Sequence, residues 1–174
     1  MCLRASLSGL VLLAAIGTSA PARAEPEGPP PPPSPPSPTG EGASVVRDQV
    51  TLMSVLSGWA LASVASGVVM ATSNDDGVRF AGIQNIAWGA IDGALAGIAL
   101  ATTKTPTDPV AARRQLSRIF AINAAIDVAY ITAGVLMTTL GKDDRVVGSG
   151  AAVIVQGGFL LGFDGIAALI VRPR

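Results

Sequence analysis

Residues 80–102 read FAGIQNIAWGAIDGALAGIALAT, a stretch that contains a single charged residue, Asp92. About 20 predominantly apolar residues are enough to cross the hydrocarbon core of a bilayer as a helix. Three further stretches have the same length and character: residues 52–72, 119–140 and 146–171. None of the four has the charged outer stripe that a helix of a soluble bundle needs. The sequence therefore predicts an all-α fold, a four-helix transmembrane bundle.

The links between these stretches are short, except for the one between the second and third, so we expect the helices to run alternately up and down. Aspartates near the links can cap the helices that follow them, and Asp108-Pro109 is typical of a capping residue followed by proline in the first helical turn. We expect a transmembrane domain over residues 44–171. Its helices are predicted at about residues 46–72, 79–102, 109–140 and 146–171.

The N-terminal 43 residues have a different composition. Residues 1–24 are typical of a signal peptide, with Arg4 before an apolar run and Ala22-Arg23-Ala24 at the expected cleavage point. Residues 25–39 contain nine prolines, which exclude helix and favour an extended chain. We predict a cleaved signal peptide over residues 1–24 and a disordered Pro-rich tether over 25–43. A ligand for an aromatic groove in a partner is the alternative role for the prolines.

The composition excludes several classes of protein. Twelve Lys and Arg balance twelve Asp and Glu, which argues against a basic nucleic-acid-binding protein. The chain has no His, and its one Cys, Cys2, lies in the predicted signal peptide. The usual zinc ligands and the His or Cys of nucleophilic catalysis are therefore missing. We expect no enzymatic activity, no cofactor, no metal and no nucleic-acid partner, and we expect membrane lipids to surround the domain.

The two halves of the apolar region resemble each other. The run from Gly67 to Thr72 aligns with the run that begins at Gly134, an offset of 67 residues. The pair Gln84 and Asp92 aligns with Gln156 and Asp164, an offset of 72 residues. We therefore expect two tandem helical hairpins, with a loop about five residues longer in the second. Repeats of two helices each cross the membrane with the same polarity.

Small residues recur four positions apart in every predicted helix. We assign six glycines to helix packing: Gly58, Gly89, Gly93, Gly97, Gly158 and Gly162. In lipid, close approach of helix backbones and the van der Waals contact that it allows hold helices together. The series from Gly89 to Gly97 is the strongest, and it packs either inside the bundle or against a second copy.

Polar side chains inside the spans are the candidate functional site. An ionisable residue there costs about 2.5–3.5 kcal/mol on insertion scales, which makes it a candidate for function. The candidates are Gln84, Asn85, Asp92, Asn123, Asp127, Gln156 and Asp164. No Lys or Arg inside the spans can neutralise the aspartates, so they are either protonated or hold a cation. Alternatively, neutral aspartates bond to amide side chains and fix the register of the helices.

The sequence favours a non-enzymatic structural or accessory protein that acts through helix contacts with another membrane protein or with a second copy. The alternative is a small proton or cation transporter or channel that uses the intramembrane aspartates. Carboxyl groups that converge favour the transport hypothesis, whereas carboxyl groups that are separately hydrogen-bonded favour the structural one.

The run Gln84-Asn85-x-x-Trp88-Gly89-x-x-Asp92, in the second of four helices, resembles an uncharacterised family of small four-helix bacterial membrane proteins. The resemblance covers residues 45–171 and implies four helices in an inner membrane, without an assigned activity. With the signal peptide, it predicts a multi-pass protein of the bacterial inner membrane whose tether is extracytoplasmic. The distribution of Lys and Arg favours the opposite orientation, and we give precedence to the signal peptide.

Overall fold

The structure, a computed structural model, describes residues 39–173 and contains four helices and no strand in that range. The helices are α1 (Thr39–Ala71), α2 (Asp76–Thr102), α3 (Pro109–Leu140) and α4 (Asp144–Ile170). All four are long and apolar enough to cross a membrane. The predicted all-α transmembrane bundle is thus confirmed. The predicted signal peptide and the tether up to residue 38 lie outside the described residues.

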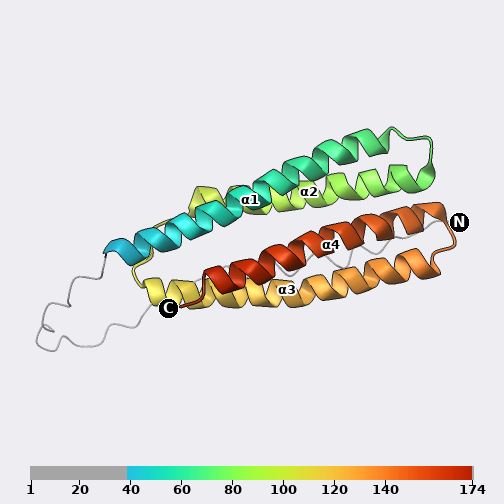
Figure 1. Cartoon of the computed structure of the whole chain (residues 1–174). Coiled ribbons are helices and arrows are strands. Elements are labelled where there is room, and N and C mark those ends of the chain that lie inside the picture. Colours follow the sequence, from blue (N-terminus) through green and yellow to red (C-terminus); the bar gives the residue numbers. More distant parts are fainter. Residues whose placement is uncertain (1–38, 174) are drawn as a thin grey trace, which may run out of the picture. The chain divides into compact units, whose positions relative to one another are not determined.

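The chain forms two antiparallel helical hairpins, α1 with α2 and α3 with α4, in the predicted up-down order (Figure 1). The hairpins contact each other mainly along α2 and α4. The links 72–75 and 141–143 lie at one end of the bundle, which we call the loop end (Figure 1). The start of α1 and the end of α4 lie at the opposite end, which we call the terminal end.

The first helix begins earlier than the sequence indicates. We predicted a tether to residue 43 and a helix from residue 46, but α1 begins at Thr39, directly after the last proline of the Pro-rich stretch. Val45 is buried, and a Cβ on Gly42 would lie 2.9 Å from the Thr105 side chain. Packing against the link between α2 and α3 therefore orders a turn whose glycines disfavour helix by themselves.

Three aspartates cap the other helices. The side chains of Asp75, Asp108 and Asp143 accept hydrogen bonds from backbone N–H groups in the first turns of α2, α3 and α4, at 2.8–2.9 Å. Such bonds satisfy donors that have no partner within the helix. They place the starts of α2 and α4 three and two residues before the predicted ones, and they confirm the Asp108-Pro109 start of α3.

The same glycine contact recurs in both hairpins. A Cβ on Gly67 of α1 would lie 2.6 Å from the carbonyl oxygen of Gly82 of α2, and one on Gly82 would lie 2.7 Å from that of Gly67. In the second hairpin the equivalent pair is Gly134 and Gly150, at 2.9 and 2.8 Å. Only glycine allows the backbones to approach this closely, so these four residues hold the hairpins together.

These contacts correct the register of the internal repeat. The offset is 67 residues between α1 and α3, as predicted, but 68 between α2 and α4, where Gly82 matches Gly150. The predicted 72 is wrong by four residues, or about one helical turn, and the second loop is longer by only one residue. A one-turn slip keeps side chains on the same face, so sequence matches alone do not expose it. In space, Asp164 corresponds to Ala96 and not to Asp92.

Four of the six glycines assigned to packing are placed differently. Gly89 is buried against α1, and Gly93 makes ordinary contact with Ala60 at 3.5 Å. The other four are exposed, with nothing within 4 Å of a Cβ: Gly58, Gly97, Gly158 and Gly162. Each step of four residues rotates about 40° around a helix of 3.6 residues per turn. Two such steps carry Gly97 off the face that Gly89 packs.

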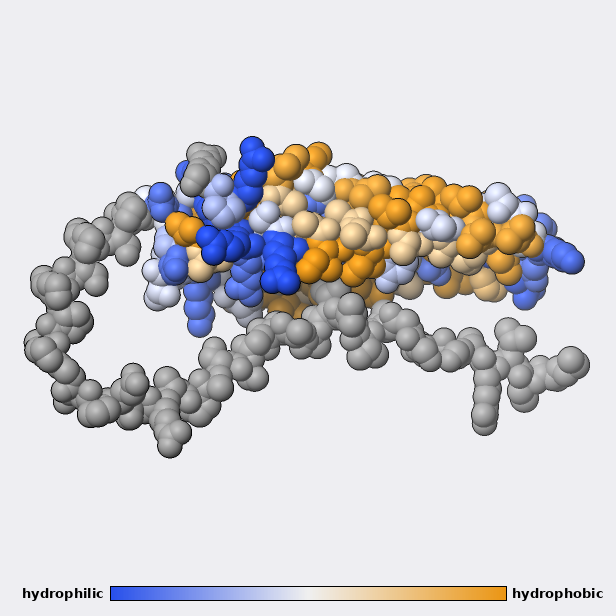
Figure 2. Space-filling view, turned by 90° about the horizontal axis from the view of Figure 1, so that it is seen from below, coloured by the Kyte–Doolittle hydropathy of each residue, from blue (hydrophilic) through white to orange (hydrophobic). Residues whose placement is uncertain are grey.

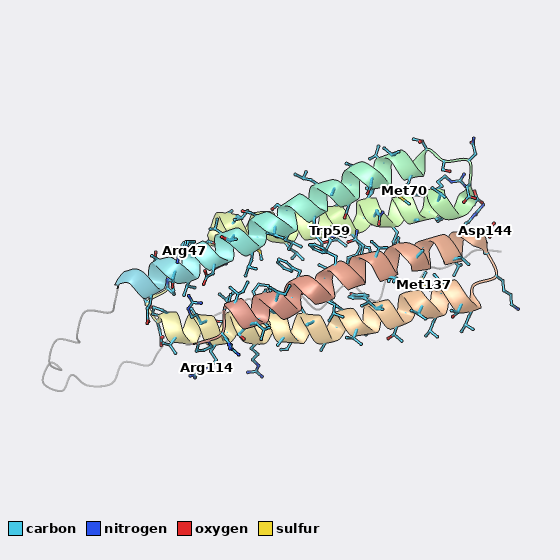
Figure 3. The ribbon with its side chains drawn as sticks, viewed as in Figure 1. Arg47, Trp59, Met70, Arg114, Met137 and Asp144 are labelled. Carbon is cyan, nitrogen blue, oxygen red and sulfur yellow. The ribbon has the colours of Figure 1, made fainter. Side chains whose placement is uncertain are left out.

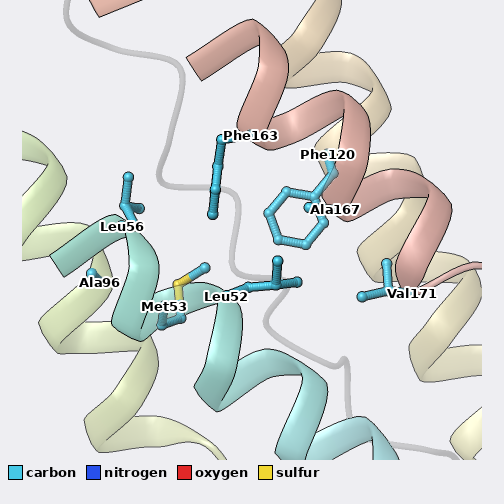
Figure 4. Close-up of a cluster of buried hydrophobic side chains, with 8 residues drawn as sticks. All are labelled: Leu52, Met53, Leu56, Ala96, Phe120, Phe163, Ala167 and Val171. Carbon is cyan, nitrogen blue, oxygen red and sulfur yellow. The ribbon is translucent and has the colours of Figure 1, made fainter. Parts of the chain in front are cut away.

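An apolar cluster joins the two hairpins in the half of the bundle nearer the terminal end (Figure 4). It consists of Leu52, Met53, Leu56, Ala96, Phe120, Phe163, Ala167 and Val171. The rings of Phe120 and Phe163 meet edge to face, with centroids 6.0 Å apart. On the face seen in Figure 2, hydrophobic residues cover the middle of the bundle and hydrophilic residues lie at both ends, as expected of a surface in contact with lipid.

Candidate functional site

Three buried carboxyl groups lie between the helices. Asp92 of α2, Asp127 of α3 and Asp164 of α4 are 3%, 4% and 5% exposed, although most of the helix surfaces around them face outward. Each comes from a different helix, and each helix turns its aspartate inward. The structure therefore brings together the three aspartates that the sequence singled out.

The closest pair is Asp127 and Asp164, whose carboxyl groups lie within hydrogen-bonding reach of each other. The amide of Asn123 is next to Asp164, and Asp92 is close enough to interact electrostatically with both. An ionised carboxylate has no hydrogen to donate, so a hydrogen bond between two carboxyl groups requires a proton on one of them.

Basic side chains are remote from this cluster. The ion pairs of residues 39–173 lie at the two ends of the bundle: Arg113 with Asp48 at 2.9 Å, and Asp76 with Arg79 and Arg145. Figure 3 shows the same separation, with Arg47 and Arg114 at the terminal end and Asp144 at the loop end. Within the described part of the chain, no three acidic groups are placed so that they could hold a metal ion. The geometry fits proton binding better than cation binding.

A second polar group links α1 to α4. Gln156 is 2% exposed, and its amide oxygen accepts a hydrogen bond from the indole N–H of Trp59 at 2.6 Å. Its amide nitrogen donates to the hydroxyl of Ser63 at 3.0 Å. Trp59 also stacks on Phe159, with ring centroids 4.0 Å apart, and lies between the two hairpins (Figure 3). These bonds hold the two hairpins in one register.

Sequence analysis identified Gln156 but not Trp59 or Ser63. The signal was present, because a tryptophan inside an apolar span needs an acceptor for its N–H. Gln84, which the sequence also proposed, is half-buried on α2 and lies away from both polar groups' hydrogen bonds.

A half-open cavity of about 210 Å³ lies beside the Gln156 group. It is lined by Trp59, Ala62, Ser63, Ser66, Asn85, Val155 and Gln156, from α1, α2 and α4. The amide nitrogen of Asn85 contacts the sulfur of Met70 at 3.7 Å, while its buried oxygen has no partner among the described residues. Asn85 therefore presents an acceptor at this cavity and does not touch the aspartates.

The chain belongs to DUF6992, a family of unknown function. The match covers residues 55–165, which include the three aspartates, Trp59 and Gln156. It confirms the expected membership of an uncharacterised family, and it assigns no activity. No curated protein and no solved structure matches the chain. The DUF6992 region begins within α1, after the Pro-rich stretch and the first turns of that helix.

Proposed function

We propose that this protein is a non-enzymatic, multi-pass membrane protein that binds and releases protons inside the membrane through Asp127 and Asp164. The observation that supports it is the approach of these two carboxyl groups from neighbouring helices, remote from every basic side chain of the described residues. Removing a shared proton leaves two negative charges side by side in a low-dielectric site, so proton binding and the packing of α3 on α4 depend on each other.

Asp92 adds a third carboxyl to the same region, from the other hairpin. Its oxygen Oδ2 is buried and has no partner among residues 39–173. Because Asp92 interacts electrostatically with Asp127 and Asp164, a proton on one carboxyl favours ionisation of its neighbours. Protonation is thereby coupled to the contact between hairpins, which is the property that a proton-driven membrane protein requires.

Infrared difference spectroscopy of the protein in lipid nanodiscs, as the pH is changed, tests the proposal. The wild type should show a carbonyl band of a protonated carboxyl group that titrates. Asp127→Asn and Asp164→Asn should each remove or shift this band. Asp144→Asn is the matched control, because Asp144 is exposed at the loop end and should leave the band unchanged. No such band in the wild type, or an identical band in both variants, would contradict proton binding.

A second candidate function is assembly with a second copy or with another membrane protein. The observation that favours it is the outward position of the glycines at residues 97, 158 and 162, which leave open space where another helix can approach. Cross-linking in a mild detergent tests it: Gly162→Leu should abolish a cross-linked product that Gly89→Ala retains if the outer surface forms the contact. Equal products from wild type and Gly162→Leu would exclude this surface.

We further propose that the protein lies in a bacterial inner membrane with its tether and terminal end outside the cytoplasm. The signal-peptide pattern supports this orientation. The basic residues oppose it, because the terminal end carries most of them: Arg47, Lys104, Arg113, Arg114, Arg118, Arg172 and Arg174. A C-terminal fusion to alkaline phosphatase should be active and a C-terminal fluorescent-protein fusion dark. The reverse result would show that the positive charges set the topology.

A further inference from the structure

We propose that the cavity beside Trp59 is a water-filled entry from the loop end to the buried aspartates, and that the apolar cluster closes the terminal end. The ligand of the cavity is therefore water, and protons reach the site from one side of the membrane only. This inference rests on the proposed function, since it concerns how protons reach the same carboxyl groups.

The position of the cavity is the first argument. Ser66 lies five residues before the end of α1, and Asn85 lies nine residues after the start of α2. At 1.5 Å per residue, these side chains are about 8–14 Å from the loop end. Helices of 27 residues are about 40 Å long and exceed a hydrocarbon core of about 30 Å, so the cavity begins close to the membrane surface at the loop end.

The second argument is the line of unpartnered acceptors that leads inward from the cavity. Three buried side-chain oxygens have no partner among the described residues: Asn85 Oδ1, Asp92 Oδ2 and Asp127 Oδ2. Asn85 lines the cavity, and Asp92 lies two helical turns further along the same face of α2. Buried polar atoms are normally satisfied by protein or by ordered water, so these oxygens indicate water between the helices.

A direct contact connects the cavity wall to the second hairpin. Gln156 lines the cavity, and a Cβ on the next residue, Gly157, would lie 3.5 Å from the backbone oxygen of Asp127. The wall of the cavity and the first aspartate of the pair are therefore at the same level of the bundle. A water molecule in the cavity can transfer a proton inward through further waters to an Asp127 carboxylate, which it converts to the neutral acid.

The third argument is the absence of a comparable route among described residues at the other end. Phe163 precedes Asp164 directly, and the apolar cluster continues from that level to Val171. The cluster draws on all four helices, and its members are aliphatic or aromatic apart from the thioether of Met53. Apolar interiors of this kind stay dry, because water there would lack hydrogen-bond partners.

Cysteine accessibility tests the entry. In a full-length Cys2→Ser background, single cysteines are placed at Ser66 and at Ala65, which lies at the same depth but does not line the cavity. The probe is a charged, membrane-impermeant methanethiosulfonate, which reacts with thiolates and therefore needs water. In proteoliposomes, Ser66→Cys should react about tenfold faster than Ala65→Cys, because a thiol in contact with lipid stays protonated.

Leu56→Cys reports on the closed end, since Leu56 belongs to the apolar cluster. It should stay unlabelled from either side of the membrane. Equal rates at residues 65 and 66, or rapid labelling of Leu56→Cys, would overturn the one-sided entry. Far-ultraviolet circular dichroism of each variant checks that the helices are retained, so that only folded variants are compared.

A second variant tests the link to proton binding. Ala62→Phe fills the cavity from its wall and should slow hydrogen–deuterium exchange of the protonated carboxyl about tenfold while leaving the amount of protonated acid at equilibrium unchanged. An unchanged exchange rate in a filled cavity would overturn the entry. If the wild type lacks the carboxyl band, proton binding fails, while fast labelling of Ser66→Cys still demonstrates the cavity. If the band is present and residue 66 is inert, the entry alone fails.

Discussion

Substitution of Gly82 by alanine should separate the hairpins' own packing from the general helix preference of the residue. A Cβ at this position would lie 2.6 Å from the backbone nitrogen of Ala71 and 2.7 Å from the carbonyl oxygen of Gly67. Both are backbone atoms, so the added methyl group can be accommodated only if α1 and α2 move apart. Overpacking of this kind costs about 1–3 kcal/mol.

Gly97→Ala is the matched control, because Gly97 lies on the same helix, is exposed and has nothing within 4 Å of a Cβ. Alanine exceeds glycine in helix propensity by about 0.8–1 kcal/mol, so this variant should be unchanged or more stable. The expected difference in free energy of unfolding between the two variants is therefore about 1–4 kcal/mol, from the overpacking and propensity ranges together.

The assay is unfolding in mixed micelles with increasing sodium dodecyl sulfate, followed by circular dichroism. Gly150→Ala should repeat the result in the second hairpin, because a Cβ on Gly150 would lie 2.8 Å from the Gly134 carbonyl oxygen. Gly158→Ala, with open space around it, should repeat the control. Equal stabilities of Gly82→Ala and Gly97→Ala would refute the conclusion that close backbone contact holds the hairpins together.

Three further predictions concern polar contacts. Gln156→Leu should destabilise the protein by about 1–3 kcal/mol and alter tryptophan fluorescence, because the Trp59 N–H loses its acceptor; an unchanged melt would show the bond to be dispensable. Asp48→Ala should cost about 3 kcal/mol in thermal unfolding by leaving the buried guanidinium of Arg113 without its carboxylate, and a melt identical to the wild type would count against this. Asp143→Ala should cost about 1 kcal/mol and speed amide hydrogen exchange in the first turn of α4, whereas unaltered exchange would argue that the cap is replaceable.

The helices and their order could be predicted from the sequence because they depend on local properties. A run of some 20 apolar residues is recognisable without knowledge of its neighbours, and in lipid every backbone polar group must be satisfied within the helix itself. The caps at Asp75, Asp108 and Asp143 are local in the same way. The unexpected start of α1 at Thr39 depended on packing against Thr105, which is distant in the sequence.

The candidate site was only partly predictable. Rarity of charge inside apolar spans identified Asp92, Asp127 and Asp164 without any structure. Their separations along the chain do not say that Asp127 faces Asp164, or that the asparagine at residue 85 belongs to a cavity instead. The bond between Trp59 and Gln156 joins residues 97 positions apart, and no local pattern pairs them.

The sequence by itself determined that this protein has four apolar helices in up-down order and three acidic residues within them, because length, hydropathy and capping act within a few turns of chain. Only the tertiary structure decided the contacts between helices. It chose Gly67, Gly82, Gly134 and Gly150 over the glycines spaced four apart, and it set the repeat offset at 68 instead of 72. Residues one turn apart share a helix face, so the pattern along one helix leaves the depth of its contacts open until a neighbouring helix packs against it.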